Sequence, residues 1–159
     1  VFNVNGEEQT IVTDGSYPNV EGDYVSVETE VIDEGYQPSI LDFSIESEDE
    51  DLTATFLKEE KLIMIVSYNL DTAEKEGLQK LKALSENAQA NGYTVIGLSA
   101  SGKDAISNIN ETYCLDFEFY LCDEKALKTV VRSNPGVLEL NKGTVQQKAH
   151  WNDIDNLDL

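Results

Sequence analysis

Apolar residues in the second half of this chain follow two kinds of pattern, which together predict alternating strands and helices. Leu62 to Val66 is an unbroken apolar run of strand length, typical of a central strand covered on both faces. A helix is expected next, with Asp71 or Thr72 as its cap and Gly92 just beyond its end. Its apolar face would be formed by Leu78, Leu81, Leu84 and Ala88.

The alternation continues to the C-terminal part of the chain. Strands are expected at 93–98 and 117–121, helices at 103–113 and 123–132, and two final strands at 137–140 and 144–148. Asn141-Lys142-Gly143 lies between the last two strands and predicts a short antiparallel hairpin. This order indicates an α/β fold class with a mixed sheet and helices on both of its faces.

The first part of the chain has a different pattern. Residues 1–5, 9–13 and 24–32 predict strands, separated by turn signals such as Asp14-Gly15. Too few large apolar residues lie here for an independent core. We therefore expect residues 1–37 to be a β-rich extension that adds strands to, or packs on, a main domain at 38–159.

Charge narrows the range of partners. The 159 residues include 31 acidic and only 11 basic side chains, which gives a net charge of −20 and a pI near 4.1. Such a chain repels phosphate backbones, so nucleic acid is not an expected partner. The longest apolar run is far shorter than a membrane helix requires. Because the chain begins at Val1 without a signal peptide, we expect a processed protein or a piece of a longer one.

Two segments resemble the thioredoxin-like family, in particular its peroxiredoxin and TlpA types. Pro135 precedes Gly143 of the predicted hairpin by eight positions, the spacing that thioredoxins show between their cis-proline and a hairpin glycine. Residues 38–45, which read Pro-Ser-Ile-Leu-Asp-Phe-Ser-Ile, are similar to the segment before the first core strand of these relatives. The resemblance implies a three-layer α/β/α fold and a cis bond before Pro135.

A narrower resemblance is to the soluble C-terminal domain of DoxX-like membrane proteins of Bacteroidetes. It is carried by residues 127–136, with Phe43-Ser44-Ile45, Val66-Ser67-Tyr68 and His150-Trp151-Asn152-Asp153. It implies a domain on the periplasmic side of the inner membrane, tethered through a preceding membrane part, in a redox-linked context.

The thioredoxin-like pattern lacks its usual sulfur here. Redox-active members place C-x-x-C after the first core strand, where a helix start stabilises the thiolate. At that place this chain has Ser67-Tyr68-Asn69, followed by Asp71 and Glu74. We therefore expect a non-catalytic binding module, with no cofactor and no metal site. Its groove would be lined by Ser67, Tyr68, Asn69, Asn134 and Pro135 and would take an unidentified protein or small molecule.

Two alternatives remain open. Cys122 follows a predicted strand and precedes a predicted helix, so it could act alone in thiol or peroxide chemistry. The domain could also be a structural spacer whose groove is filled by its own side chains. Cys114 is expected to pack in the interior, and His150, which has no recognisable triad partner, is expected to have a structural or surface role.

Overall fold

The computed structural model describes residues 1–29 and 43–159. The chain divides into two compact units, Val1–Ser39 and Ile40–Leu159, and each is treated by itself below. The division falls close to the expected boundary after residue 37, which itself lies outside the described residues. Residues 38–42 of the family-like segment and residues 30–32 of the strand predicted at 24–32 also lie outside them. Of the described part of that predicted strand, only Tyr24 is in a strand, so the prediction was wrong for residues 25–29.

The N-terminal unit has a three-stranded antiparallel sheet of order β2-β1-β3. Its strands are β1 (Phe2–Val4), β2 (Glu7–Gln9) and β3 (Asp23–Tyr24). The second strand begins earlier than expected, because Asn5 and Gly6 both have positive φ angles and reverse the chain at once. These strands pair with one another and form a sheet separate from that of the larger unit. Of the two expected alternatives, the one in which they add strands to the main sheet was therefore wrong.

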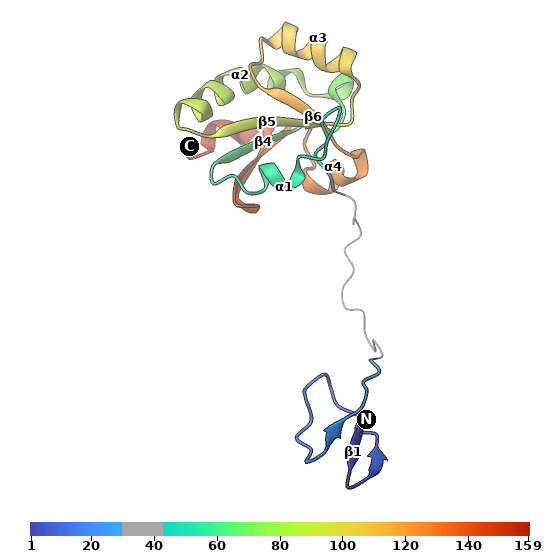
Figure 1. The fold of residues 1–159 in the computed structure, drawn as a ribbon. Coiled ribbons are helices and arrows are strands. Elements are labelled where there is room, and N and C mark those ends of the chain that lie inside the picture. The colour runs from blue at the N-terminus through green and yellow to red at the C-terminus, as the bar shows by residue number, and fades with distance from the viewer. Residues whose placement is uncertain (30–42) are drawn as a thin grey trace. The chain divides into compact units, whose positions relative to one another are not determined.

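The larger unit has a five-stranded mixed sheet of order β6-β5-β4-β7-β8 (Figure 1). The three strands β4, β5 and β6 are parallel, and β7 and β8 are antiparallel to their neighbours. The strands are β4 (Leu62–Val66), β5 (Thr94–Ser99), β6 (Glu118–Leu121), β7 (Gly136–Asn141) and β8 (Thr144–His150). The predicted hairpin is confirmed, with Lys142 and Gly143 at positive φ between β7 and β8.

Helices cover both faces of this sheet, as Figure 1 shows. They are α1 (Thr53–Phe56), α2 (Lys75–Ala90), α3 (Lys103–Tyr113) and α4 (Glu124–Val130), with 3-10 turns η1 (Leu70–Thr72) and η2 (Trp151–Asn156). The helix α2 begins later than expected, because Asn69 caps η1 through its side chain before α2 starts. The short elements α1 and η2 were not predicted, since neither is long enough to show a periodic pattern.

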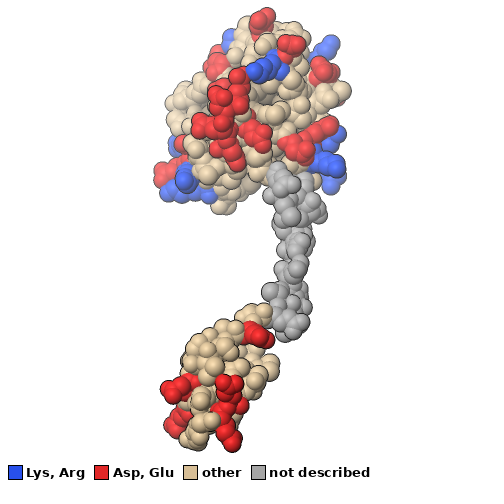
Figure 2. All heavy atoms as spheres, turned by 45° about the vertical axis from the view of Figure 1, so that its right-hand side comes forward, with Lys and Arg blue, Asp and Glu red and all other residues tan. Residues whose placement is uncertain are grey.

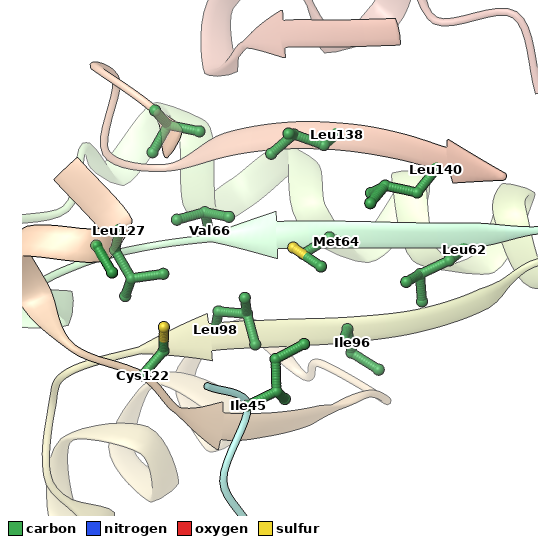
Figure 3. Packing of buried hydrophobic residues seen from close by; sticks show 12 residues of the cluster. Ile45, Leu62, Met64, Val66, Ile96, Leu98, Cys122, Leu127, Leu138 and Leu140 are labelled. Carbon is green, nitrogen blue, oxygen red and sulfur yellow. The ribbon is translucent and has the colours of Figure 1, made fainter. Parts of the chain in front are cut away.

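The core lies in two layers, one on each side of the sheet. Side chains of β4 alternate between them: Leu62, Met64 and Val66 pack with Leu127 of α4 in one layer, shown in Figure 3. Ile63 and Ile65 pack with the leucines of α2 in the other. Every side chain of β4 is buried, which confirms the predicted central strand and the three-layer α/β/α class.

Candidate functional site

Pairing between β4 and β7 brings the expected site residues together. Val66 at the end of β4 is the register partner of Gly136 at the start of β7. The loop that leaves β4 therefore lies beside the loop that enters β7, although their residues are far apart in the sequence. The bond between Asn134 and Pro135 is cis, which confirms what the resemblance to thioredoxins implied.

Asn134 joins the two loops through its side chain and its backbone. Its Oδ1 accepts a hydrogen bond from Ser67 Oγ at 2.7 Å, and its Nδ2 donates to the backbone oxygen of Asn69 at 2.6 Å. Its own backbone oxygen accepts from the N–H of Glu74 at 2.8 Å. These bonds use the polar atoms that a ligand entering between the loops would need.

The place between the loops is filled by protein. Ser67 is 0% exposed and Asn134 only 6%, and Pro135 is fully buried. Gly77 of α2 packs closely against Pro135 and Trp151. A Cβ atom added to Gly77 would lie 2.8 Å from Pro135 Cδ and 2.8 Å from Trp151 Cβ. Three of the five expected groove residues are thus enclosed, and their role in binding stays a prediction.

We expect Gly77→Ala to destabilise the fold by about 1–3 kcal/mol, because the added methyl group must displace Pro135 or Trp151 from close packing. Alanine is the better helix former by about 1 kcal/mol, so a loss of stability requires the steric effect to dominate. Urea denaturation measures the change. Gln79→Ala, at an exposed position of the same helix, is the control and should stay within about 0.5 kcal/mol of wild type.

The accessible part of the site is formed by Tyr68 and Asn69, which are both half-buried. Lys128 of α4 places its Nζ 5.2 Å from the centre of the Tyr68 ring and also forms an ion pair with Glu124 at 2.6 Å. The hydrogen bond that Lys128 donates to the Glu124 carboxylate raises the pKa of Lys128 above its usual value. Lys128 was not among the expected groove residues, although the i,i+4 spacing of Glu124 and Lys128 on a predicted helix was a visible signal.

Cys122 lies in the core layer around β4 rather than at an open surface (Figure 3). Its side chain is 3% exposed. Burial raises the pKa of the Cys122 thiol to about 11, and the backbone N–H groups of Ser44 and Asp123 offset this only in part. A thiol that remains protonated and enclosed at neutral pH is a poor nucleophile, which counts against the alternative of a Cys122 enzyme.

The raised pKa of Cys122 predicts a specific loss of stability at high pH. Between pH 9 and 11 the folded chain keeps the thiol proton while the unfolded chain has released it, so stability falls as pH rises. We expect wild type to lose about 2–3 kcal/mol more than Cys122→Ala over this interval. Urea titrations at each pH measure the difference, and parallel curves for the two proteins would contradict the burial of this thiol.

Two other expected residues have different surroundings from Cys122. Cys114 is exposed, not packed inside as expected, because it adopts the left-handed conformation that ends α3. Both thiols are free. His150 is exposed, and its Nδ1 accepts from the N–H of Asn152 at 3.1 Å, which begins the turn η2.

Two hollows lie beside the C-terminal segment. One of about 210 Å³ lies between α2 and the chain end, next to Lys80, Ile154 and Leu159. The other, of about 180 Å³, lies along β8 next to His150 and Asp153. Neither is lined by any of the five expected groove residues.

Neither a membrane-spanning helix nor a cluster of metal-ligating side chains occurs in the described residues. No helix within residues 1–29 and 43–159 is both long enough and apolar enough to cross a bilayer. Across the same two ranges, no three His, Cys, Asp or Glu side chains come together as a possible metal site.

Comparisons with known proteins support a fold assignment. No protein-family model matches the sequence, and no curated protein matches it. Among solved structures, reduced Prx3 from Vibrio vulnificus in complex with hydrogen peroxide aligns with a TM-score of 0.52 at 8% identity, covering 67% of this chain and 80% of that one. A thiol-disulfide oxidoreductase from Bacteroides fragilis NCTC 9343 aligns with a TM-score of 0.52 at 14% identity, covering 66% and 82%.

A third solved structure is BsSco, a member of the Sco family of cytochrome c oxidase assembly proteins. It aligns with a TM-score of 0.50 at 11% identity, covering 72% of this chain and 86% of its own. At these identities the likeness concerns the fold, which it supports as thioredoxin-like.

Proposed function

We propose that this chain, whose fold is thioredoxin-like, is a non-catalytic interaction domain rather than a thiol enzyme. The observation that carries the proposal is the loop after β4, where redox-active relatives have their cysteine pair. Here Ser67 occupies that place, and its hydroxyl is buried and donates to Asn134. A buried hydroxyl without a neighbouring base has no route to act as a nucleophile.

The remaining sulfur atoms do not replace the missing pair. Thiol exchange needs an accessible thiolate, often beside a second cysteine. Cys122 is buried with a raised pKa, and Cys114 lies at the exposed end of α3.

Turnover measurements test the absence of catalysis. We expect no insulin disulfide reduction with dithiothreitol, and no hydroperoxide consumption, above the uncatalysed rate. The same should hold for Cys122→Ser and Cys114→Ser. A wild-type rate that Cys122→Ser abolishes and Cys114→Ser retains would overturn the proposal in favour of a single-cysteine enzyme.

The proposed setting is the periplasmic side of the inner membrane, with a tether supplied by a preceding membrane part and a redox-linked role. Support comes from the similarity of four segments to the soluble domain of DoxX-like proteins. A thiol-disulfide oxidoreductase among the structural neighbours is consistent with a redox link. The gene sequence upstream of Val1 should then encode several apolar stretches of membrane length.

The exposed thiol of Cys114 provides a test of location. In cells whose outer membrane is permeabilised, a membrane-impermeant maleimide should label Cys114 without lysis. Cys114→Ser should remove this label. Labelling that requires rupture of the inner membrane would place the domain in the cytoplasm and contradict the proposal.

The proposed contact region of the larger unit is the accessible part of the site, formed by Tyr68 with Asn69 and Lys128. Its partner would be a protein or small molecule that reaches the Tyr68 ring and the Lys128 ammonium. An interaction role requires that Tyr68→Ala with Lys128→Ala increases the sensitivity of cells to thiol oxidants. Lys125→Ala, at an exposed position of the same helix, is the matched control and should have no effect.

A structural spacer is the second candidate, and the enclosed Pro135 favours it. Ser67 and Asn134 beside this proline are buried as well, as expected of a groove filled by its own side chains. For a spacer, the Tyr68 and Lys128 substitutions and the Lys125 control would be equally silent in cells. The oxidant measurement therefore separates the two candidates.

A further inference from the structure

The sheet of the N-terminal unit encloses very little apolar surface. Among residues 1–29, Phe2 is the only buried side chain, at 5% exposure. Its ring is flanked edge-on by Tyr17, at 5.8 Å between ring centres, and by Tyr24, at 6.0 Å. Both tyrosines remain open to solvent, with exposures of 77% and 55%.

Other apolar side chains of this unit are exposed as well. Val12 is 92% exposed, Val27 69% and Val25 44%. In residues 43–159, which hold most of the chain, the large apolar side chains that are exposed are Leu121 and Val145. Exposed aromatic and apolar side chains that are concentrated in one small unit are typical of a protein-binding surface.

The charge around this surface has a single sign. Every charged side chain within residues 1–29 is acidic: Glu7, Glu8, Asp14, Glu21, Asp23 and Glu28. Figure 2 shows acidic groups on the N-terminal unit and no basic group in that view. Such a surface repels a second copy of itself, anionic lipid and nucleic acid, and it attracts a cationic partner.

The exposed tyrosines favour the same kind of partner, because a Lys or Arg side chain is attracted to the face of a tyrosine ring. We propose that residues 1–29 form a docking surface for a cationic segment of another protein. Its Lys or Arg side chains would lie against Tyr17 and Tyr24, and its apolar side chains would cover the exposed valines. This surface does not depend on the proposed function of the larger unit, which turnover measurements test separately.

Three synthetic peptides of equal length test the proposal by fluorescence anisotropy against the full chain. One alternates arginine with valine, one arginine with serine, and one glutamate with valine. We expect the arginine–valine peptide to bind at least about tenfold more tightly than either of the others. Its affinity should fall as salt is added. Equal binding of the glutamate–valine peptide, or no binding of the arginine–valine peptide, would overturn the proposal.

Substitutions locate the surface. Tyr17→Ser with Tyr24→Ser should weaken binding of the arginine–valine peptide at least about tenfold, whereas Tyr17→Phe with Tyr24→Phe should retain it, since the ring faces remain. Val145→Ser and Leu121→Ser, at exposed apolar positions of the larger unit, are the matched controls and should bind like wild type. A loss of binding in either control would overturn the assignment.

A variant with fewer charges tests the surface without changing the aromatic packing around Phe2. Glu7→Gln with Glu8→Gln and Asp23→Asn removes three exposed charges and should reduce the salt dependence of binding. An unchanged salt dependence would contradict the role of these carboxylates. Sedimentation measurements test whether the partner is a second copy of this chain. A dimer that forms with increasing concentration, and that the double tyrosine-to-serine variant abolishes, would overturn the proposal.

Discussion

Leu127→Ala should lower the free energy of unfolding by about 2–5 kcal/mol, because it removes a fully buried side chain from the core layer around β4. Figure 3 places Leu127 next to Cys122 in this layer. The cavity should therefore expose the thiol as well as weaken the fold. Urea denaturation measures the first effect, and the rate of Cys122 labelling by a thiol reagent in a Cys114→Ser background measures the second.

The control for this substitution is Leu121→Ala. Leu121 lies at the end of β6, on the same stretch of chain, but is 50% exposed. Its truncation should cost about 1 kcal/mol or less and leave the labelling of Cys122 slow. Equal losses of stability in the two variants, or labelling of Leu127→Ala at the wild-type rate, would contradict the packing around Cys122.

Asn134→Ala should cost about 2–4 kcal/mol, because it leaves the buried Ser67 hydroxyl without its partner and also removes the hydrogen bond to the backbone oxygen of Asn69. The m-value should stay the same if the rest of the fold is intact. Asn141→Ala, at an exposed position of β7, is the control and should change stability by less than about 0.5 kcal/mol.

A double-mutant cycle isolates the bond between the two loops. Since Ser67 and Asn134 share a buried hydrogen bond, Ser67→Ala with Asn134→Ala should cost less than the sum of the two single changes. We expect an interaction energy of about 1 kcal/mol. Additive costs would show that the hydrogen bond between Ser67 and Asn134 does not stabilise the fold.

The main sheet could be predicted because its strands carry strong local patterns. The apolar run from Leu62 to Val66 required cover on both faces, and the structure provides it. Asn141-Lys142-Gly143 marked the hairpin, whereas the cis bond before Pro135 was expected from the resemblance to thioredoxins. For the strand and the hairpin the physical cause lies within a few residues of the signal, so a single sequence reveals it.

The details of the site depend on contacts between distant residues, and these could not be predicted. No local pattern shows that the Ser67 hydroxyl meets Asn134. The surroundings of Cys122 combine β6, α4 and the segment at Ile45, and only their packing decides that the thiol is buried. Cysteine is usually buried, so Cys114 was expected in the interior, but its left-handed backbone conformation at the end of α3 leaves it exposed.

The N-terminal sheet buries very little apolar surface, and its unfolding therefore contributes little to a calorimetric scan. The heat capacity change of unfolding scales with the apolar area that becomes hydrated, and among residues 1–29 Phe2 alone supplies such area from a buried position. Of the described residues, the larger unit therefore supplies almost all of the heat capacity change of unfolding. A substitution that melts the first sheet would leave the calorimetric peak in place, and its effect would be visible in the near-ultraviolet signals of Tyr17 and Tyr24.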